Sequence, residues 1–337
     1  MNAASKQFDG KHKYIRITDI DENTSEYRGD GVVSPDTEID EHYRVKENDI
    51  LFARTGASTG KTYLYDPKDG RLYYAGFLIR MNVSPRNDSR FVFYQTQTPR
   101  YKKWVQIMSM RSGQPGINSQ EYSSYRCFLP KLEEQQKIAK LLTIIDQRIS
   151  IQNKVIEKYE SLIKALCHNL IISFNGTVCH IGDILKIGSG KDYKHLTAGS
   201  IPVFGTGGYM LSVSDWLYEG ESVCIGRKGT INNPFYVDGK FWTVDTLFYT
   251  YDFEGVLPKY CYYLFQTIDW LQYNEASGVP SLSKTTIERI QISIPSIDEQ
   301  AKAVQVLDRV EMAITCWREL LNHDKAIKQY LLSQLFI

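Results

Sequence analysis

The chain contains one internal repeat, which limits its fold to two units of the same construction. The segment LPKLEEQQKIAKLL at residues 129–142 resembles IPSIDEQAKAVQVL at residues 294–307, and the two lie 165 residues apart. Upstream, LFARTG at residues 51–56 resembles CIGRKG at residues 224–229. Because self-similarity of this kind indicates repeated architecture, each unit is predicted to be a turn-rich segment followed by a helix.

Each repeat ends in the pattern of a long amphipathic helix. Apolar residues recur at alternating steps of four and three, which is typical of a coiled coil. Gln152 interrupts the first series, and Asp324 and Lys328 break the second. Ser296 followed by Glu299 predicts a capping box at the start of the second helix.

A solitary amphipathic helix must bury its apolar stripe, so we predict that the two helices pair. The alternative is that each helix packs on its own domain. The predicted pairing residues are Ile138, Leu142, Ile145, Ile149 and Ile156 in the first helix and Leu307, Val310, Ile314, Trp317 and Leu321 in the second.

The segments before the helices combine short aromatic or β-branched runs with Gly, Asn and Pro, which predicts strands and turns. Helical patterns near residues 90–108 and 258–273 make both segments mixed. The expected fold class is α+β, with two mixed α/β domains separated by two long helices. The expected bounds are 1–129 for the first domain, 130–173 for its helix, 174–295 for the second domain and 296–337 for the second helix.

Composition excludes some classes of protein. Lys and Arg number 40 and Asp and Glu number 39, so the net charge of +1 excludes a uniformly basic nucleic-acid coat but not local basic patches. No apolar run reaches the roughly 18 residues of a membrane helix, and the amino-terminal sequence lacks a signal-peptide core, which predicts a cytoplasmic protein without a membrane partner. Six scattered cysteines are typical of reduced thiols.

Several segments approach a catalytic or ligand-binding signature without matching it. GASTGKT at residues 56–62 has three residues between its glycines, where a phosphate-binding loop has four. FGTGG at residues 204–208 and NPFY at residues 233–236 resemble the two signatures of adenine methyltransferases, with wrong spacing or composition. Cys167-His168 and Cys179-His180 match no zinc pattern. The sequence therefore predicts no catalytic residue and no metal site.

The paired motifs together resemble the specificity subunit of Type I restriction–modification enzymes. The resemblance rests on both Pro-x-x-x-Glu-Gln helix starts, on YIRITDID at residues 14–21, on LFARTG and on the Ser-Gly pairs before each helix, and it covers nearly the whole chain. It implies a non-catalytic protein in which two target recognition domains each read one half of a split sequence in the major groove of double-stranded DNA.

The resemblance also implies partners. The two helices would pair antiparallel as a spacer and dock two methyltransferase subunits, and restriction subunits that translocate DNA would join them. S-adenosylmethionine, ATP and magnesium would be held by those partners, so this chain would bind no cofactor. Two other functions stay open: a degenerate or fused DNA adenine methyltransferase that uses residues 204–208 and 233–236, and a coiled-coil scaffold without DNA binding.

The first domain departs from this pattern. The second domain opens with VCHIGDILKIGSGKDYKHLTAG at residues 178–199, and no similar segment precedes Tyr14 in the first. We therefore expect the first domain to lack about 20 residues of its opening and to present an unpaired edge around residues 14–20 and 50–54.

Base contacts are expected from side chains on turns. Arg and Lys donate well to guanine, and Asn and Gln pair with adenine. For each candidate the alternative is a phosphate contact or a solvated loop side chain. The candidates are Arg54, Arg111, Gln114 and Asn118 in the first domain and Arg227, Lys228, Ser281 and Lys284 in the second.

Overall fold

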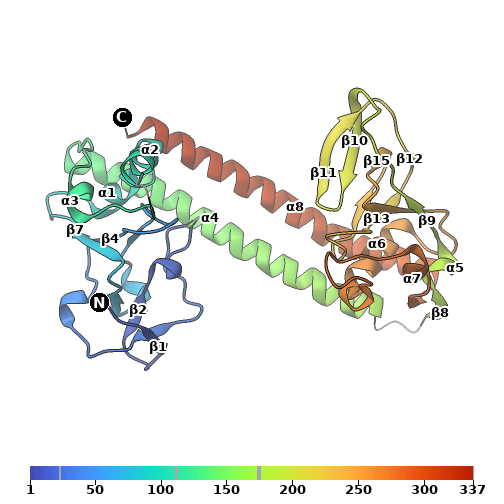
Figure 1. Ribbon diagram of the computed structural model, residues 1–337, viewed down its shortest axis with the longest axis horizontal. Helices are drawn as coiled ribbons and strands as arrows, with labels where there is room; N and C mark the ends of the chain where they lie inside the picture. Colours follow the sequence, from blue (N-terminus) through green and yellow to red (C-terminus); the bar gives the residue numbers. More distant parts are fainter. Residues whose placement is uncertain (23, 111–112, 173–175, 337) are drawn as a thin grey trace. The chain divides into compact units, whose positions relative to one another are not determined.

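The computed structural model describes residues 1–22, 24–110, 113–172 and 176–336. They form two compact units: unit 1 comprises Met1–Asn153 with Glu319–Ile337, and unit 2 comprises Lys154–Arg318. Two long helices contribute to both units, α4 (Leu132–Cys167) and α8 (Ile297–Gln334), which are green and red in Figure 1. The predicted α+β class, with two mixed domains and two long helices, is confirmed.

Unit 2 contains two four-stranded sheets and one two-stranded sheet. The first sheet has the order β14 (Phe235–Val237), β13 (Ser222–Gly226), β16 (Leu247–Tyr251), β9 (Lys186–Ser189). The second has the order β11 (Gly208–Val213), β10 (Ala198–Gly205), β15 (Lys240–Thr243), β12 (Tyr218–Glu219). β8 (Thr177–His180) pairs with β17 (Gln291–Ile294). The shorter helices are the π-helical turn η4 (His168–Ile172), α5 (Ile181–Ile184), α6 (Pro258–Thr267), η5 (Trp270–Tyr273) and α7 (Lys284–Glu288).

Unit 1 contains a three-stranded sheet and two strand pairs. The sheet has the order β5 (Thr62–Leu64), β4 (Asp49–Ala53), β7 (Leu78–Asn82). The pairs are β2 (Lys13–Ile15) with β6 (Leu72–Tyr74), and β1 (Ser5–Gln7) with β3 (Val33–Pro35). The helices are η1 (Ile17–Asp19), η2 (Glu41–Tyr43), η3 (Pro67–Asp69), α1 (Ser89–Gln95), α2 (Pro99–Met108) and α3 (Ser119–Ser123).

The repeat in sequence is a repeat in hydrogen-bonding register. Leu51 on β4 lies opposite Arg80 on β7, and Cys224 on β13 lies opposite Tyr249 on β16. Each unit also has one parallel strand pair, β2 with β6 and β10 with β15. Offsets of 173 residues for the first strand and 169 for its partner therefore connect equivalent positions of the two units.

The expected position of an unpaired edge in unit 1 is wrong. β4 lies in the centre of its sheet because it pairs with β5 on one side and β7 on the other. β2 pairs with β6, so residues 13–15 are not an open edge either. Within the described residues, β7 is the edge of this sheet that corresponds to β16, which in unit 2 is covered by β9.

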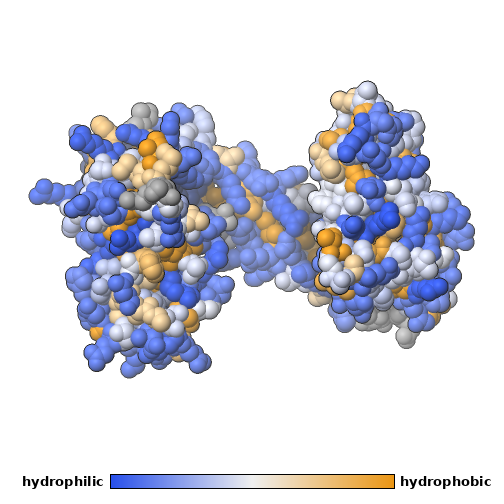
Figure 2. Space-filling view, viewed as in Figure 1, coloured by the Kyte–Doolittle hydropathy of each residue, from blue (hydrophilic) through white to orange (hydrophobic). Residues whose placement is uncertain are grey.

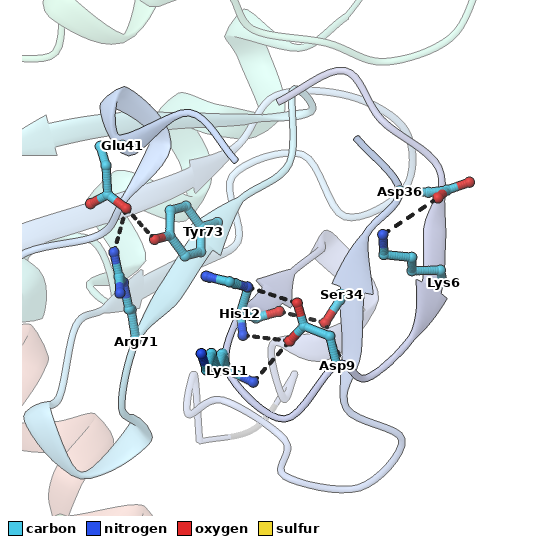
Figure 3. A network of polar contacts seen from close by, with 9 residues as sticks. All are labelled: Lys6, Asp9, Lys11, His12, Ser34, Asp36, Glu41, Arg71 and Tyr73. Carbon is cyan, nitrogen blue, oxygen red and sulfur yellow. Dashed lines mark hydrogen bonds and ion pairs between the residues drawn. The ribbon is translucent and has the colours of Figure 1, made fainter. Parts of the chain in front are cut away.

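The amino-terminal segment of unit 1 is fixed by a polar network (Figure 3). The Asp9 carboxylate accepts hydrogen bonds from the amides of Lys11 and His12, both at 2.8 Å, and lies 2.7 Å from His12 Nδ1. The Ser34 hydroxyl donates to the carbonyl of His12 at 2.7 Å. The hydrogen bonds from His12 hold the pKa of Asp9 well below its usual range, so this network keeps its charge at neutral pH.

The two long helices run antiparallel within each unit. In unit 1, Gln152 donates to the Asp324 carboxylate at 2.6 Å, and Lys328 lies 2.6 Å from Asp146. In unit 2, Arg318 donates to Glu160 at 2.6 Å. Of the predicted pairing residues, those buried are Leu142, Ile149, Ile156, Leu307, Ile314 and Leu321. Those half-buried are Ile138, Ile145, Val310 and Trp317.

Asp324 and Lys328 do not end the buried stripe, contrary to expectation. They continue its heptad spacing and are only 3% and 8% exposed. A buried charge is tolerated only when it is paired and hydrogen-bonded. Asp324 has Gln152 and also Arg148, whose Nε lies 2.7 Å away, and Lys328 has Asp146. Charged residues at these positions therefore require matching partners on α4.

A buried glutamine explains the repeated Pro-x-x-x-Glu-Gln motif. Gln300 accepts from the Leu257 amide at 2.9 Å, and its amide nitrogen donates to the carbonyls of Pro295 at 2.9 Å and Gly255 at 3.0 Å. This side chain ties the start of α8 to the loop that enters α6.

Gln135 makes the equivalent set of contacts in unit 1. It accepts from the Asp88 amide at 3.0 Å and donates to the Pro130 carbonyl at 2.8 Å and to Asn87 Oδ1 at 3.1 Å. Both glutamines are almost fully buried. The same residue therefore joins helix to domain twice.

Only half of the predicted capping box forms. The Glu299 carboxylate accepts from the Ser296 amide at 3.0 Å, but the Ser296 hydroxyl donates to the same carboxylate at 2.7 Å. The hydroxyl therefore supports the glutamate, whose pKa is lowered by these two bonds.

Replacing Gln300 with leucine should destabilise unit 2 strongly. The change leaves one buried donor and two buried acceptors without their partner, which costs about 3 kcal/mol in total. The loss is measured as the change in free energy of unfolding by urea. Gln305→Leu on the exposed face of the same helix is the control, and an equal effect of both substitutions would contradict this role.

Candidate nucleic-acid interface

Two loops of unit 2 are held together beside the end of β13. The Gly229 amide donates to the Pro280 carbonyl at 2.8 Å, and the Leu282 amide donates to the Arg227 carbonyl at 2.9 Å. Gly229 has a φ of +97°, a conformation that L side chains rarely adopt, so glycine permits this turn. The loop after β13 therefore lies against the segment before α7.

The four residues predicted in the second domain meet in one open cleft of about 520 Å³. Arg227 and Lys228 are exposed, and the Arg227 guanidinium lies 5.8 Å from the centroid of the Phe248 ring. Lys228 and Ser281 form an isolated β-bridge. The lining residues used below are Arg227, Lys228, Glu275, Ser281, Ser283 and Lys284.

Glu275 is absent from the predicted residues, although it lies in the same cleft. The Thr286 hydroxyl donates to its carboxylate, as do the amide and hydroxyl of Ser283 at 3.1 and 2.8 Å. These bonds lower the pKa of Glu275, so it is ionised at neutral pH. The position 165 residues earlier is Met110, and this change from apolar to acidic within a repeated frame is the signal that could have indicated it.

Unit 1 builds the same loop pair. The Gly56 amide donates to the Pro115 carbonyl at 2.9 Å, and the Ile117 amide donates to the Arg54 carbonyl at 2.9 Å. Gln114 lies on the second of these loops and its side-chain amide lies close to Gly56. The structure therefore brings Arg54 and Gln114 into neighbouring loops, as it does Arg227 and Ser281 in unit 2.

The other two candidates of the first domain do not join this pair in the same way. Arg111 lies outside the described residues. Asn118 caps α3: its Oδ1 accepts from the Glu121 amide at 2.9 Å, and its own amide donates to the Glu121 carboxylate at 2.7 Å. Its carbonyl oxygen is therefore already engaged in a helix cap, as is the hydroxyl of Ser283 at the equivalent position of unit 2.

The near-matches to known motifs have structural roles. Residues 56–62 lead into a strand, and their turn is closed by hydrogen bonds of its own, while Lys61 donates to the Ile20 carbonyl at 3.0 Å. Residues 204–208 make the turn between β10 and β11, and residues 233–236 lead into β14. Across the described part of the chain, no three His, Cys, Asp or Glu residues are grouped as a metal site would need. No helix there combines the length and apolarity needed to cross a bilayer.

The loop pair, the two mixed units and the paired helices are shared with a known family. The family model for the Type I restriction modification DNA specificity domain matches residues 1–161 and 176–323. The chain therefore belongs to this family.

Among its relatives is the Type I restriction enzyme MjaVIII specificity subunit of Methanocaldococcus jannaschii, 25% identical over 191 residues, which cover 51% of this chain and 44% of the relative. The EcoprrI specificity subunit of Escherichia coli is 23% identical over 142 residues, or 39% of this chain and 35% of the relative. The chain thus matches less than half the length of each.

Two solved structures share the fold. The S subunit of a Type I restriction–modification system from M. genitalium has a TM-score of 0.69 at 18% identity, and the match covers 99% of this chain and 94% of that one. A chain from a structural study of assembly of the type I R-M system has a TM-score of 0.57 at 14% identity, covering 95% and 90%.

Replacing Thr286 with valine should raise the pKa of Glu275. The variant keeps the side-chain shape and removes a hydrogen bond that favours the ionised carboxylate. Because the folded-state pKa is depressed, the stabilisation that Glu275 contributes is present above its unfolded pKa and is lost as the pH falls through its folded pKa. Carboxyl ¹³C NMR titration measures the shift, with Thr285→Val as the exposed control. An unchanged pKa in Thr286→Val would show that other contacts fix the carboxylate.

Proposed function

We propose that this chain is the DNA-reading specificity subunit of a Type I restriction–modification complex, in which each unit reads one half of a bipartite target. One observation carries the proposal. Both units hold the same loop pair, with Arg54 and Arg227 at the same place, while the side chains around them differ. A shared frame positions the protein on DNA, and differing side chains specify the bases.

The cleft of unit 2 suits a half-site that contains a G·C pair. Arg227, Lys228 and Lys284 are donors of the kind that guanine O6 and N7 accept in the major groove. The fixed Glu275 carboxylate is an acceptor for the amino group of cytosine. Donors and an acceptor in one cleft match the two edges of such a pair.

Unit 1 suits a different half-site. Arg54 is exposed and offers guanidinium donors, and Gln114 offers the carboxamide that pairs with adenine N6 and N7. Arg111 is a third candidate by sequence.

The chain itself would perform no chemistry. Methyl transfer would belong to two methyltransferase subunits docked on the paired helices, and cleavage to restriction subunits. S-adenosylmethionine, ATP and magnesium would be bound by those subunits. Such a complex acts on chromosomal and invading DNA in the cytoplasm, without a membrane partner. Methyl transfer from S-adenosylmethionine by the isolated chain would contradict this proposal and favour the methyltransferase alternative.

Arg227→Ala should reduce methylation of the cognate site by about 10- to 100-fold, because a lost bidentate contact removes about 1–3 kcal/mol of discrimination. Glu275→Gln should keep methylation but relax the sequence at one base pair, since an amide both donates and accepts. Sequencing of methylated bases in cells that carry the cognate methyltransferase measures both.

Lys302→Ala, on an exposed position of α8, is the control for a general loss of charge. If the methylated sequence is unchanged in Glu275→Gln and its rate is unchanged in Arg227→Ala, then this cleft does not read DNA.

Lengthening both helices should change only the gap between the half-sites. Four residues inserted after Gln152 and four after His323 add about 6 Å of rise and roughly 40° of rotation beyond one turn. At about 3.4 Å per base pair, the gap should widen by one or two base pairs. The same sequencing reports the gap. Insertion into α4 alone should destabilise the protein, because it separates Gln152 from Asp324. An altered half-sequence would show that the helices also read bases.

A further inference from the structure

The sheets of the two units differ at one edge. In unit 2, β9 covers the outer edge of β16, with Gly188 opposite Tyr249 and Ile187 opposite Thr250. In unit 1, the equivalent strand β7 is the last strand of its sheet among the described residues. The shared register makes Arg80 the counterpart of Tyr249 and Met81 the counterpart of Thr250.

The backbone of this edge is oriented to accept a strand. The Arg54 amide donates to the Phe77 carbonyl, and the Val83 amide donates to the Asn48 carbonyl, on the β4 side. Hydrogen-bonding direction alternates along an antiparallel strand, so the amides and carbonyls of Arg80 and Asn82 face outward. In unit 2, the residues at the equivalent positions pair with β9.

Apolar side chains beside this edge are exposed in unit 1 and covered in unit 2. Met81 is 37% exposed, whereas Thr250 is fully buried. Leu129 is 43% exposed, whereas its counterpart Ile294 is 7% exposed, and Phe128 next to Leu129 is 72% exposed. Exposed apolar side chains also appear on the face of unit 1 seen in Figure 2. The cover in unit 2 consists of β8, α5 and β9.

The amino terminus marks where this cover would end. The Met1 ammonium donates to the Tyr74 carbonyl at 2.7 Å, and the Lys191 amide donates to the equivalent Thr243 carbonyl at 2.8 Å. Met1 therefore occupies the place of Lys191, the second residue after β9. The first ten residues, fixed by the Asp9 network, lie beyond this point in the chain and do not pair with β7.

We propose that the outer edge of β7, together with Phe128 and Leu129, is a docking site for an extended segment of a separate polypeptide. The partner would add a strand to the sheet, so main-chain hydrogen bonds would provide affinity and alternate side chains specificity. Unit 2 defines its chemistry: a strand, a short helical turn and a second strand, with apolar residues at the positions of Ile184 and Ile187 and a small one at Gly188.

The probe is a fluorescein-labelled peptide of residues 176–191, added to the full chain and followed by fluorescence anisotropy. We expect saturable binding of one peptide per chain. Met81→Lys and Leu129→Lys should each weaken it about tenfold, because they place a charge in the apolar part of the site. Met312→Lys, at an exposed methionine of α8, should leave binding unchanged.

A second measurement covers the case in which a free peptide binds too weakly to detect. Residues 176–190 fused directly before Met1 should raise the melting temperature of unit 1 by about 4 °C or more, whereas a scrambled segment of the same composition should not. Neither binding nor stabilisation, or binding that Met81→Lys does not affect, would overturn the proposal. A dimer of the chain that Met81→Lys dissociates would also overturn it, since a second copy would then cover the edge. None of these readouts depends on DNA binding.

Discussion

One buried glutamine in each unit fixes the recognition loops relative to a long helix. Gln300 and Gln135 each connect the first turn of a helix to the loop that enters the neighbouring short helix. Tyrosines extend the attachment: the Tyr263 hydroxyl donates to Asp308 at 2.6 Å, and the Tyr94 hydroxyl donates to Asp146 at 2.7 Å. Because these bonds are buried or half-buried, water does not replace them cheaply. Each domain therefore moves with its own helix segment.

The repeat separates positioning from reading. The hydrogen bonds that hold the loop pair occur twice with the same geometry, at Gly56 and Pro115 and at Gly229 and Pro280. The side chains that the loops carry are not repeated, since Glu275 stands where the first unit has Met110. A sequence can therefore vary at the reading positions while the backbone frame stays the same.

The sequence predicted the helices, their pairing and the strand-and-turn character of the domains, because hydrophobic period is a local signal. Which strand lies at an edge depends on pairing order, which is not local, so the open edge was placed on residues 50–54 instead of β7. Asp324 and Lys328 looked like the end of a stripe because their partners Asp146 and Arg148 lie far away in sequence. Glu275 was missed because its order depends on Ser283 and Thr286.

The polar part of the helix seam occurs once, although the helices are repeats of each other. The positions 165 residues from Gln152, Asp324 and Lys328 are Trp317, Tyr159 and Ile163. If two copies of α4 from different chains paired with each other, each Gln152 would be buried without the carboxylate that it binds here. Such a pair would bear the cost of unsatisfied polar groups. The seam thus makes α4 select α8 over a copy of itself, and disfavours symmetric assemblies built from two identical half-proteins.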